Sequence, residues 1–142
     1  MWSLAAAGAA APALGADVRN AASDGAIADF TLNDALGAKR SLSQWSEARA
    51  IVVVFLGTEC PLAKLYGKKL AEMDEAYAAR GVQLVGINSN QQDTLQEIAA
   101  FARRHGIEFP ILKDPGARVA DLFGATRTPE ALIASQLPKR PA

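Results

Sequence analysis

The chain contains one cysteine, Cys60, and its neighbours are those that make a thiol reactive. Pro61 follows it directly, and proline suits the first position of a helix because its missing N–H would have no partner there. We therefore predict that Cys60 lies at the N-cap of a helix, with its sulfur beside free backbone N–H groups. The helix dipole alone would lower the thiol pKa by at most about 1.5 units, which leaves the sulfur mostly protonated at neutral pH.

A fully reactive thiolate needs a cation in addition to the helix dipole. Lys64 comes one helical turn after Cys60 and lies on the same face of the predicted helix. A solvated lysine at that spacing is worth only about 0.2 to 0.5 kcal/mol. Arg127 is the second candidate.

Composition bounds the other chemistry that the chain could perform. It has 142 residues, half of them apolar, with fifteen basic and fifteen acidic side chains and a single histidine. These numbers predict one globular domain with an adequate core and give no sign of nucleic-acid binding. One histidine and one cysteine cannot build a zinc or iron–sulfur site, and no glycine-rich phosphate loop is present. We expect no metal and no cofactor.

The first residues have the composition of an export signal. Residues 1–16 are rich in alanine, too short to span a bilayer, and end in small residues spaced as in a cleavage site. We predict a signal peptide there, a linker over residues 17–28, and a periplasmic or other extracytoplasmic location. The stretch lacks Lys and Arg, so a disordered alanine-rich extension is the alternative. An unpaired cysteine in an oxidising compartment is either buried and inert, a reactive thiol, or the site of an intermolecular disulfide.

The elements that must position Cys60 follow from hydrophobic spacing. Residues 51–56 form an apolar run that predicts a strand buried on both faces. Before it, residues 30–42 predict a small hairpin, and residues 43–48 a helical turn carrying Trp45 inward. After it comes the cysteine helix, whose apolar stripe we interpret as core packing, with members Leu62, Leu65, Tyr66, Leu70, Met73 and Tyr77.

The second half continues the alternation of strands and helices. Residues 82–87 and 109–112 predict strands, and a capping box at residues 94–97 opens a helix that Gly106 ends. His105, in the last turn of that helix, favours a contact with the helix C-terminus over a catalytic role. A turn and a short helix follow, and then a last strand over residues 131–134. The order predicts an α/β sheet with helices on both faces, in one domain over residues 29–136 with a disordered tail at 137–142.

With these residues identified, the chain resembles the thioredoxin-fold redoxins, specifically the alkyl hydroperoxide reductase and thiol-specific antioxidant group. The resemblance runs from about residue 29 to residue 130. Its motifs are FLGTECPLAKLY at the cysteine, GINSN after the second strand of the pattern, EFPILKDP, and FGATRTPE. The resemblance implies that Cys60 occupies the first-cysteine position and that Thr128 and Pro129 form a cis-proline turn facing it. The Thr128 backbone would then bind a substrate chain, with Arg127 beside the site.

The chain also departs from the family patterns. Ala63 stands where thioredoxins have their second cysteine, so a dithiol cycle within one chain is impossible. The peroxiredoxin pattern Pro-x-x-x-Thr-x-x-Cys is absent, because Val53 stands at the proline position and Thr58 lies only two residues before Cys60. The family fold continues with a further strand and helix, so we expect a C-terminally truncated fold. The strand at residues 131–134 would then present an open edge that favours a homodimer.

Two functions follow as hypotheses. The first is a one-cysteine thiol oxidoreductase with antioxidant activity, in which Cys60 attacks a peroxide or a disulfide and an external thiol or redox partner protein regenerates it. Thr58 would donate its hydroxyl to the reacting oxygen, Lys64 and Arg127 would stabilise the thiolate, and Thr128 would contact the substrate. The alternative is a non-catalytic binding module that holds a peptide or protein in the cis-proline groove.

Overall fold

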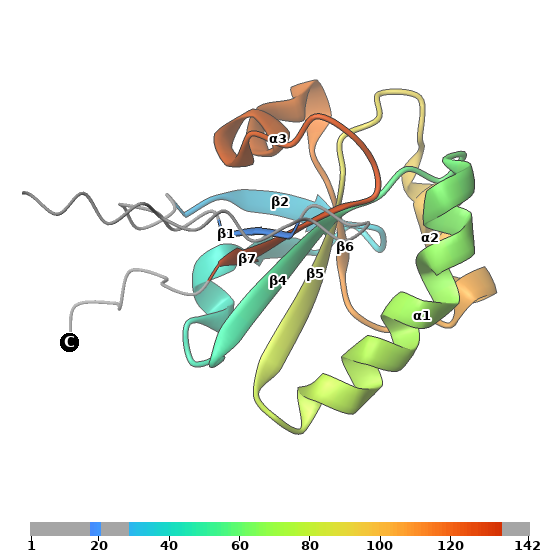
Figure 1. Ribbon diagram of the computed structural model, residues 1–142. Coiled ribbons are helices and arrows are strands. Elements are labelled where there is room, and N and C mark those ends of the chain that lie inside the picture. The colour runs from blue at the N-terminus through green and yellow to red at the C-terminus, as the bar shows by residue number, and fades with distance from the viewer. Residues whose placement is uncertain (1–17, 21–28, 135–142) are drawn as a thin grey trace, which may run out of the picture.

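The computed structural model describes residues 18–20 and 29–134, which form one mixed sheet with helices on both faces (Figure 1). The strand order is β1-β7-β4-β5-β6-β2-β3. The strands are β1 (Val18–Asn20), β2 (Thr31–Asp34), β3 (Lys39–Ser41), β4 (Ala50–Phe55), β5 (Val82–Asn88), β6 (Ile111–Lys113) and β7 (Glu130–Ala134). The helical segments are η1 (Leu42–Trp45), α1 (Pro61–Ala78), α2 (Leu95–His105), η2 (Pro115–Ala117) and α3 (Arg118–Phe123).

The centre of the sheet is the parallel pair β4 and β5, with β6 parallel to β5 and β7 antiparallel to β4. The predicted hairpin is confirmed, since β2 and β3 pair antiparallel. The predicted α/β class with helices on both faces is also confirmed. The sequence pattern predicted a strand at residues 109–112, whereas β6 begins at Ile111. The physical reason is Pro110, which has no N–H to donate to a ladder.

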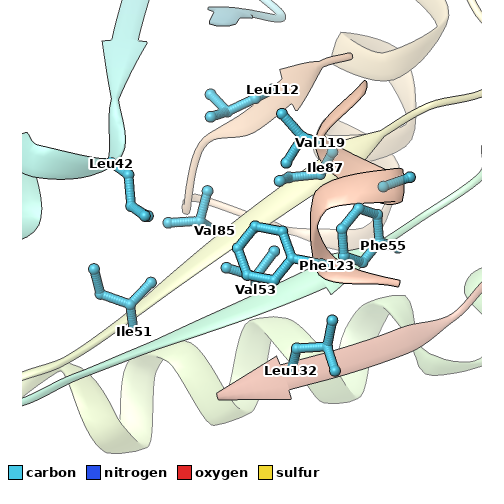
Figure 2. Close-up of a cluster of buried hydrophobic side chains, with 11 residues drawn as sticks. Leu42, Ile51, Val53, Phe55, Val85, Ile87, Leu112, Val119, Phe123 and Leu132 are labelled. Carbon is cyan, nitrogen blue, oxygen red and sulfur yellow. The ribbon is translucent and has the colours of Figure 1, made fainter. Parts of the chain in front are cut away.

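Two apolar clusters hold the layers together. Alternate side chains of β4 and β5 point to opposite faces, as the period of a strand requires. One cluster joins the sheet to α3 and η1, and Figure 2 shows it with Phe55 and Phe123 packed side by side. The second cluster joins the other face to α1 and α2 and includes Val54, Leu84 and Phe101. The sheet is therefore covered on both faces near its centre.

The last predicted strand does not have an open edge. β7 pairs with β4 on one side and with β1 on the other, where Val18 pairs with Ala131. The expectation of an open edge at β7 was wrong, because residues 18–20, assigned to a linker, form a parallel strand that satisfies the backbone groups of β7. A homodimer through that edge loses the reason for which it was expected. The predicted signal peptide and the tail at 137–142 lie outside the described residues.

The apolar stripe on α1, which we interpreted as core packing, lies mostly on the exposed face of the helix. The buried residues of α1 are the small Ala63 and Gly67, whereas five of the six large apolar residues of the stripe are exposed. The reason is close packing against α2. The ring of His105 occupies the space beside Gly67, where an added Cβ would lie 2.5 Å from His105 Cγ. None of the described helices is long and apolar enough to cross a membrane.

A double-mutant cycle tests this helix contact. Glycine inside a helix costs about 0.5 to 1 kcal/mol relative to alanine, but in this fold Gly67→Ala should lower the free energy of unfolding because the new methyl meets the His105 ring. In a His105→Ala background the same substitution should be neutral or stabilising. Urea denaturation of the four proteins measures both effects. Equal effects of Gly67→Ala in the two backgrounds would contradict the contact.

Candidate active site

Cys60 lies at the N-cap of α1, at the C-terminal end of β4, as the sequence predicted. Its backbone is extended, with φ −69° and ψ 119°, and its carbonyl accepts the first helical hydrogen bond from the Lys64 N–H at 3.0 Å. The residue is partly buried and unbonded to any other cysteine. A free sulfur is therefore held at the positive end of an 18-residue helix.

The loop that precedes β7 brings Thr128 to the sulfur. Cys60 Sγ donates a hydrogen bond to the Thr128 carbonyl oxygen at 3.3 Å, across 68 residues of sequence. The Thr128–Pro129 peptide bond is cis, and both residues are partly buried. Three of the residues that the sequence singled out thus meet at one place. The Cys60 thiol is therefore held against the backbone of the bend that leads into β7.

Opposing effects set the pKa of the Cys60 thiol. Burial raises it, whereas a hydrogen bond with the Thr128 side chain and bonds from the Ala63 and Leu62 N–H groups lower it, and the net pKa is below the usual range for a thiol. The backbone N–H groups belong to the first turn of α1, which is the effect expected at a helix N-terminus. The thiolate is therefore favoured mainly by hydrogen bonds from its immediate surroundings.

Of the two predicted cations, Lys64 is paired with another side chain and Arg127 is exposed. Lys64 Nζ forms an ion pair with the exposed Glu59 at 3.0 Å. The pKa of His105 is lowered by burial first and then by the charges of Arg104 and Lys64, so Lys64 also acts toward α2. Arg127 is exposed, and its backbone N–H donates to Glu130 Oε2 at 3.4 Å. A charge in water is strongly screened, so any influence of Arg127 on the sulfur is expected to be weak.

Thr58 is held from behind by a buried carboxylate, Asp93. The Thr58 N–H donates to Asp93 Oδ2 at 2.8 Å, and the Thr58 side chain bonds the same carboxylate. The hydroxyl that the sequence analysis assigned to a reacting oxygen is therefore already used within the protein. Through these two bonds to Asp93, Thr58 fixes the turn that leads to Cys60.

Asp93 organises the whole loop behind the cysteine turn, and the sequence analysis did not identify it. Its Oδ2 also accepts from Asn88 Nδ2 at 2.6 Å and from Asn90 Nδ2 at 3.4 Å. Lys113 Nζ donates to the carbonyls of Asp93 and Asn90 in the same loop. Burial raises the Asp93 pKa, but the bonds from Thr58, Asn88 and Asn90 lower it by more. The GINSN motif was the signal in the sequence, because it supplies both asparagines.

A second buried carboxylate, that of Glu130, fixes the loop on the other side of the sulfur. Glu130 Oε2 accepts from the Thr126 N–H at 2.9 Å as well as from Arg127. Between the two loops stands Gly57, where a Cβ would lie 2.6 Å from Asn90 Nδ2 and 3.5 Å from Thr128 Oγ1. The absence of a side chain at Gly57 therefore allows the three segments of the site to approach closely.

Comparison with known proteins agrees with this arrangement. The model of the AhpC/TSA family matches residues 24–140, which is most of the chain. The chain belongs to the AhpC/TSA family. The resemblance drawn from the motifs around Cys60 and Pro129 is thereby confirmed.

Individual relatives of this AhpC/TSA protein are distant. It is 26% identical over 108 residues to the thiol-disulfide oxidoreductase ResA of Halalkalibacterium halodurans, covering 76% of this chain and 60% of ResA. The crystal structure of the hypothetical protein SMc02350 from Sinorhizobium meliloti matches with a TM-score of 0.72 and 34% identity, covering 76% of this chain and 62% of that one. Peroxidoxin BcpB from Mycobacterium tuberculosis matches with a TM-score of 0.62 and 24% identity, covering 75% and 70%.

These similarities confirm the predicted thioredoxin-like fold. They also place the AhpC/TSA chain in the redoxin family, some of whose members are named thiol-disulfide oxidoreductases. The chain spans about three fifths of the length of the curated relatives that it matches.

The acid stability of the protein should depend on Asp93. A carboxyl group whose pKa is lower in the folded state stabilises the fold above its unfolded pKa of about 3.9, and this stabilisation is lost as the pH falls through the folded value. In Asp93→Asn, the free energy of unfolding at pH 7 should fall by about 1 to 3 kcal/mol. Between pH 5 and pH 2, the variant should lose less of its free energy of unfolding than the parent protein does. Denaturation across that range measures both quantities. A parallel pH dependence in both proteins would contradict a lowered pKa.

The Cys60 pKa should respond to Thr128 more than to the exposed cation. Thr128→Val removes the side-chain hydrogen bond that lowers the thiol pKa, and should therefore raise that pKa. Arg127→Ala should raise it by less. Thr126→Val, in the same loop but exposed, is the matched control. The rate of iodoacetamide alkylation against pH gives each pKa, and a larger shift in Arg127→Ala than in Thr128→Val would reverse the assignment.

Proposed function

We propose that this chain is a one-cysteine thiol oxidoreductase whose preferred reaction is exchange with a disulfide. The observation that carries the proposal is the position of Cys60 Sγ, which lies at the N-cap of α1 and 3.3 Å from the Thr128 carbonyl. The lowered thiol pKa supplies the nucleophile, since the thiolate is the attacking species. Similarity to thiol-disulfide oxidoreductases supports the same reaction class.

In this reaction, the Cys60 thiolate attacks one sulfur of a substrate disulfide. The S–S bond breaks, the second sulfur leaves as a thiolate that takes up a proton, and Cys60 is left in a mixed disulfide. An external thiol then attacks the mixed disulfide and restores Cys60. The buried Ala63 offers no second thiol within reach, so the reductant must come from outside the chain. The Thr128 backbone and Pro129 would align the substrate segment.

Reaction with a peroxide is the second chemistry of the same sulfur. The thiolate would attack one peroxide oxygen, the O–O bond would break, and the departing alkoxide would take a proton as sulfenic acid forms on Cys60. Two external thiols would then return the sulfur to the reduced state with release of water. We rank this reaction lower because Thr58, the hydroxyl proposed to assist it, bonds Asp93.

A non-catalytic binding module is the alternative. The observation that supports it is Ala63, which stands where a second cysteine would be needed for a dithiol cycle. In either case, we propose that the chain acts outside the cytoplasm, on the basis of its N-terminal composition. A redox partner protein or a small thiol would regenerate Cys60.

Replacing Cys60 tests the proposal directly. Reduced protein should form a mixed disulfide with oxidised glutathione faster than free cysteine does at neutral pH, because the low pKa enlarges the thiolate fraction. Cys60→Ser should form none. Mass spectrometry follows the mixed disulfide, and a parallel incubation with cumene hydroperoxide follows sulfenic acid. Faster oxidation by the hydroperoxide than by glutathione disulfide would favour the peroxidase. A rate no higher than that of a free thiol with both reagents would favour the binding module.

A further inference from the structure

A cavity of about 450 Å³ lies between the first half of β5, the β2–β3 hairpin and helix α2. It exists because the sheet is incomplete there. β5 begins at Val82, but its pairing with β6 begins only at Gly86, since Pro110 has no N–H to extend the ladder. In the register of β4 and β5, Val82 pairs with Ala50, the first residue of β4, whereas Cys60 follows the last. The cavity is therefore at the end of the sheet opposite the thiol.

Most of the cavity wall is apolar. The buried side chains of Ile107 and Phe109 line it, together with the half-buried Trp45 of η1. Helix α2 contributes small side chains such as Ala99, which leave the volume open. Leu36, in the turn of the hairpin, borders the mouth and is 87% exposed, so an apolar group bound there would cover part of it. Sites for small ligands have volumes of about 300 to 1,000 Å³, and this cavity lies within that range.

The charge available to a ligand in the cavity is positive. Asp34 is occupied within the hairpin, because its Oδ1 accepts the N–H groups of Leu36 and Ala38, both at 2.9 Å. Its Oδ2 accepts from Arg40 Nε at 3.0 Å, and the two Nη groups of Arg40 have no partner among the described residues. Arg103, in the last turn of α2, is exposed and likewise bonds no described residue. Two guanidinium groups thus border an apolar cavity.

The other acidic group at the cavity, Glu108, does not neutralise these guanidinium groups. Within the described part of the chain, no ion pair joins it to Arg40 or Arg103. Its charge acts instead on Asp74 of α1, whose pKa is raised by burial first and then by Glu108. The cavity therefore favours an anion over a cation.

We propose that this cavity binds a small acid in which a short chain joins one carboxylate to an aromatic ring. Guanidinium groups suit the carboxylate, since their planar N–H donors match its two oxygens. The carboxylate would accept hydrogen bonds from Arg103 and from the Nη groups of Arg40. The ring would contact Trp45 and Phe109, because aromatic rings gain from edge and offset contacts as well as from burial. The proposal does not depend on the redox function of Cys60.

Titration of the isotope-labelled full chain with hydrocinnamate, followed by NMR, tests the site. We expect saturable shifts in the amide signals of residues 99–111 and in the indole N–H signal of Trp45, which Trp2→Phe identifies. The dissociation constant should be on the order of a millimolar or lower for a ligand of this size. Hydrocinnamyl alcohol and the corresponding amine keep the ring but remove or invert the charge, so both should bind more weakly. No saturable shift with the acid, or binding of either analogue as tight as that of the acid, would overturn the proposal.

Matched variants locate the binding. Arg103→Gln should weaken hydrocinnamate binding about tenfold, as expected for the loss of one hydrogen bond to a charged group. Arg104→Gln removes the same charge from the next residue of α2, outside the cavity, and should leave the affinity unchanged. Ala99→Leu should prevent binding by filling the cavity, whereas Ala100→Leu, which does not border it, should not. Circular dichroism checks folding, and the arginine pair decides alone if Ala99→Leu does not fold. Equal weakening by the two arginine variants, or parent-like binding by folded Ala99→Leu, would show that the acid binds elsewhere.

Discussion

The antiparallel ladder between β4 and β7 is the constraint on which the site depends. Phe55, the last residue of β4, pairs with Glu130, the first residue of β7. The segments just beyond these ends must therefore lie side by side, and they contain Cys60 and Thr128. The 3.3 Å contact between Cys60 Sγ and the Thr128 carbonyl is a consequence of that register. A shift by one residue would reverse the faces of β7 and separate the two groups.

Buried carboxylates convert this register into a rigid site. Asp93 and Glu130 each support a loop that reaches the sulfur: Asp93 accepts the Thr58 N–H, and Glu130 accepts the N–H groups of Thr126 and Arg127. Bonds between a charged acceptor and an N–H donor are stronger than neutral ones, and inside a protein their loss leaves a costly unpaired group. The Cys60 sulfur is thus partly exposed, while the groups that hold its surroundings are buried. This separation lets a substrate reach Cys60 without disturbing the supporting bonds.

The two faces of helix α1 differ in the size of their side chains. Its inner face needs small residues, because Ala63 lies under the cysteine turn and Gly67 admits the His105 ring of α2. Large side chains would hold α1 away from the sheet and move Cys60 from Thr128. The large apolar residues are consequently on the outer face, where they are exposed along most of the helix.

The sequence by itself determined the order of strands and helices, the N-cap position of Cys60 and the family, because these depend on local spacing and on short motifs. Only the tertiary structure decided the roles of Asp93, Glu130 and Gly57, which act through contacts between segments distant in the chain. It also reversed two expectations: residues 18–20 cover the edge of β7, and the α1 stripe faces solvent. A periodic pattern shows that a helix has an apolar face. Which face is buried depends on how closely neighbouring elements can approach, and that is a property of the packed fold.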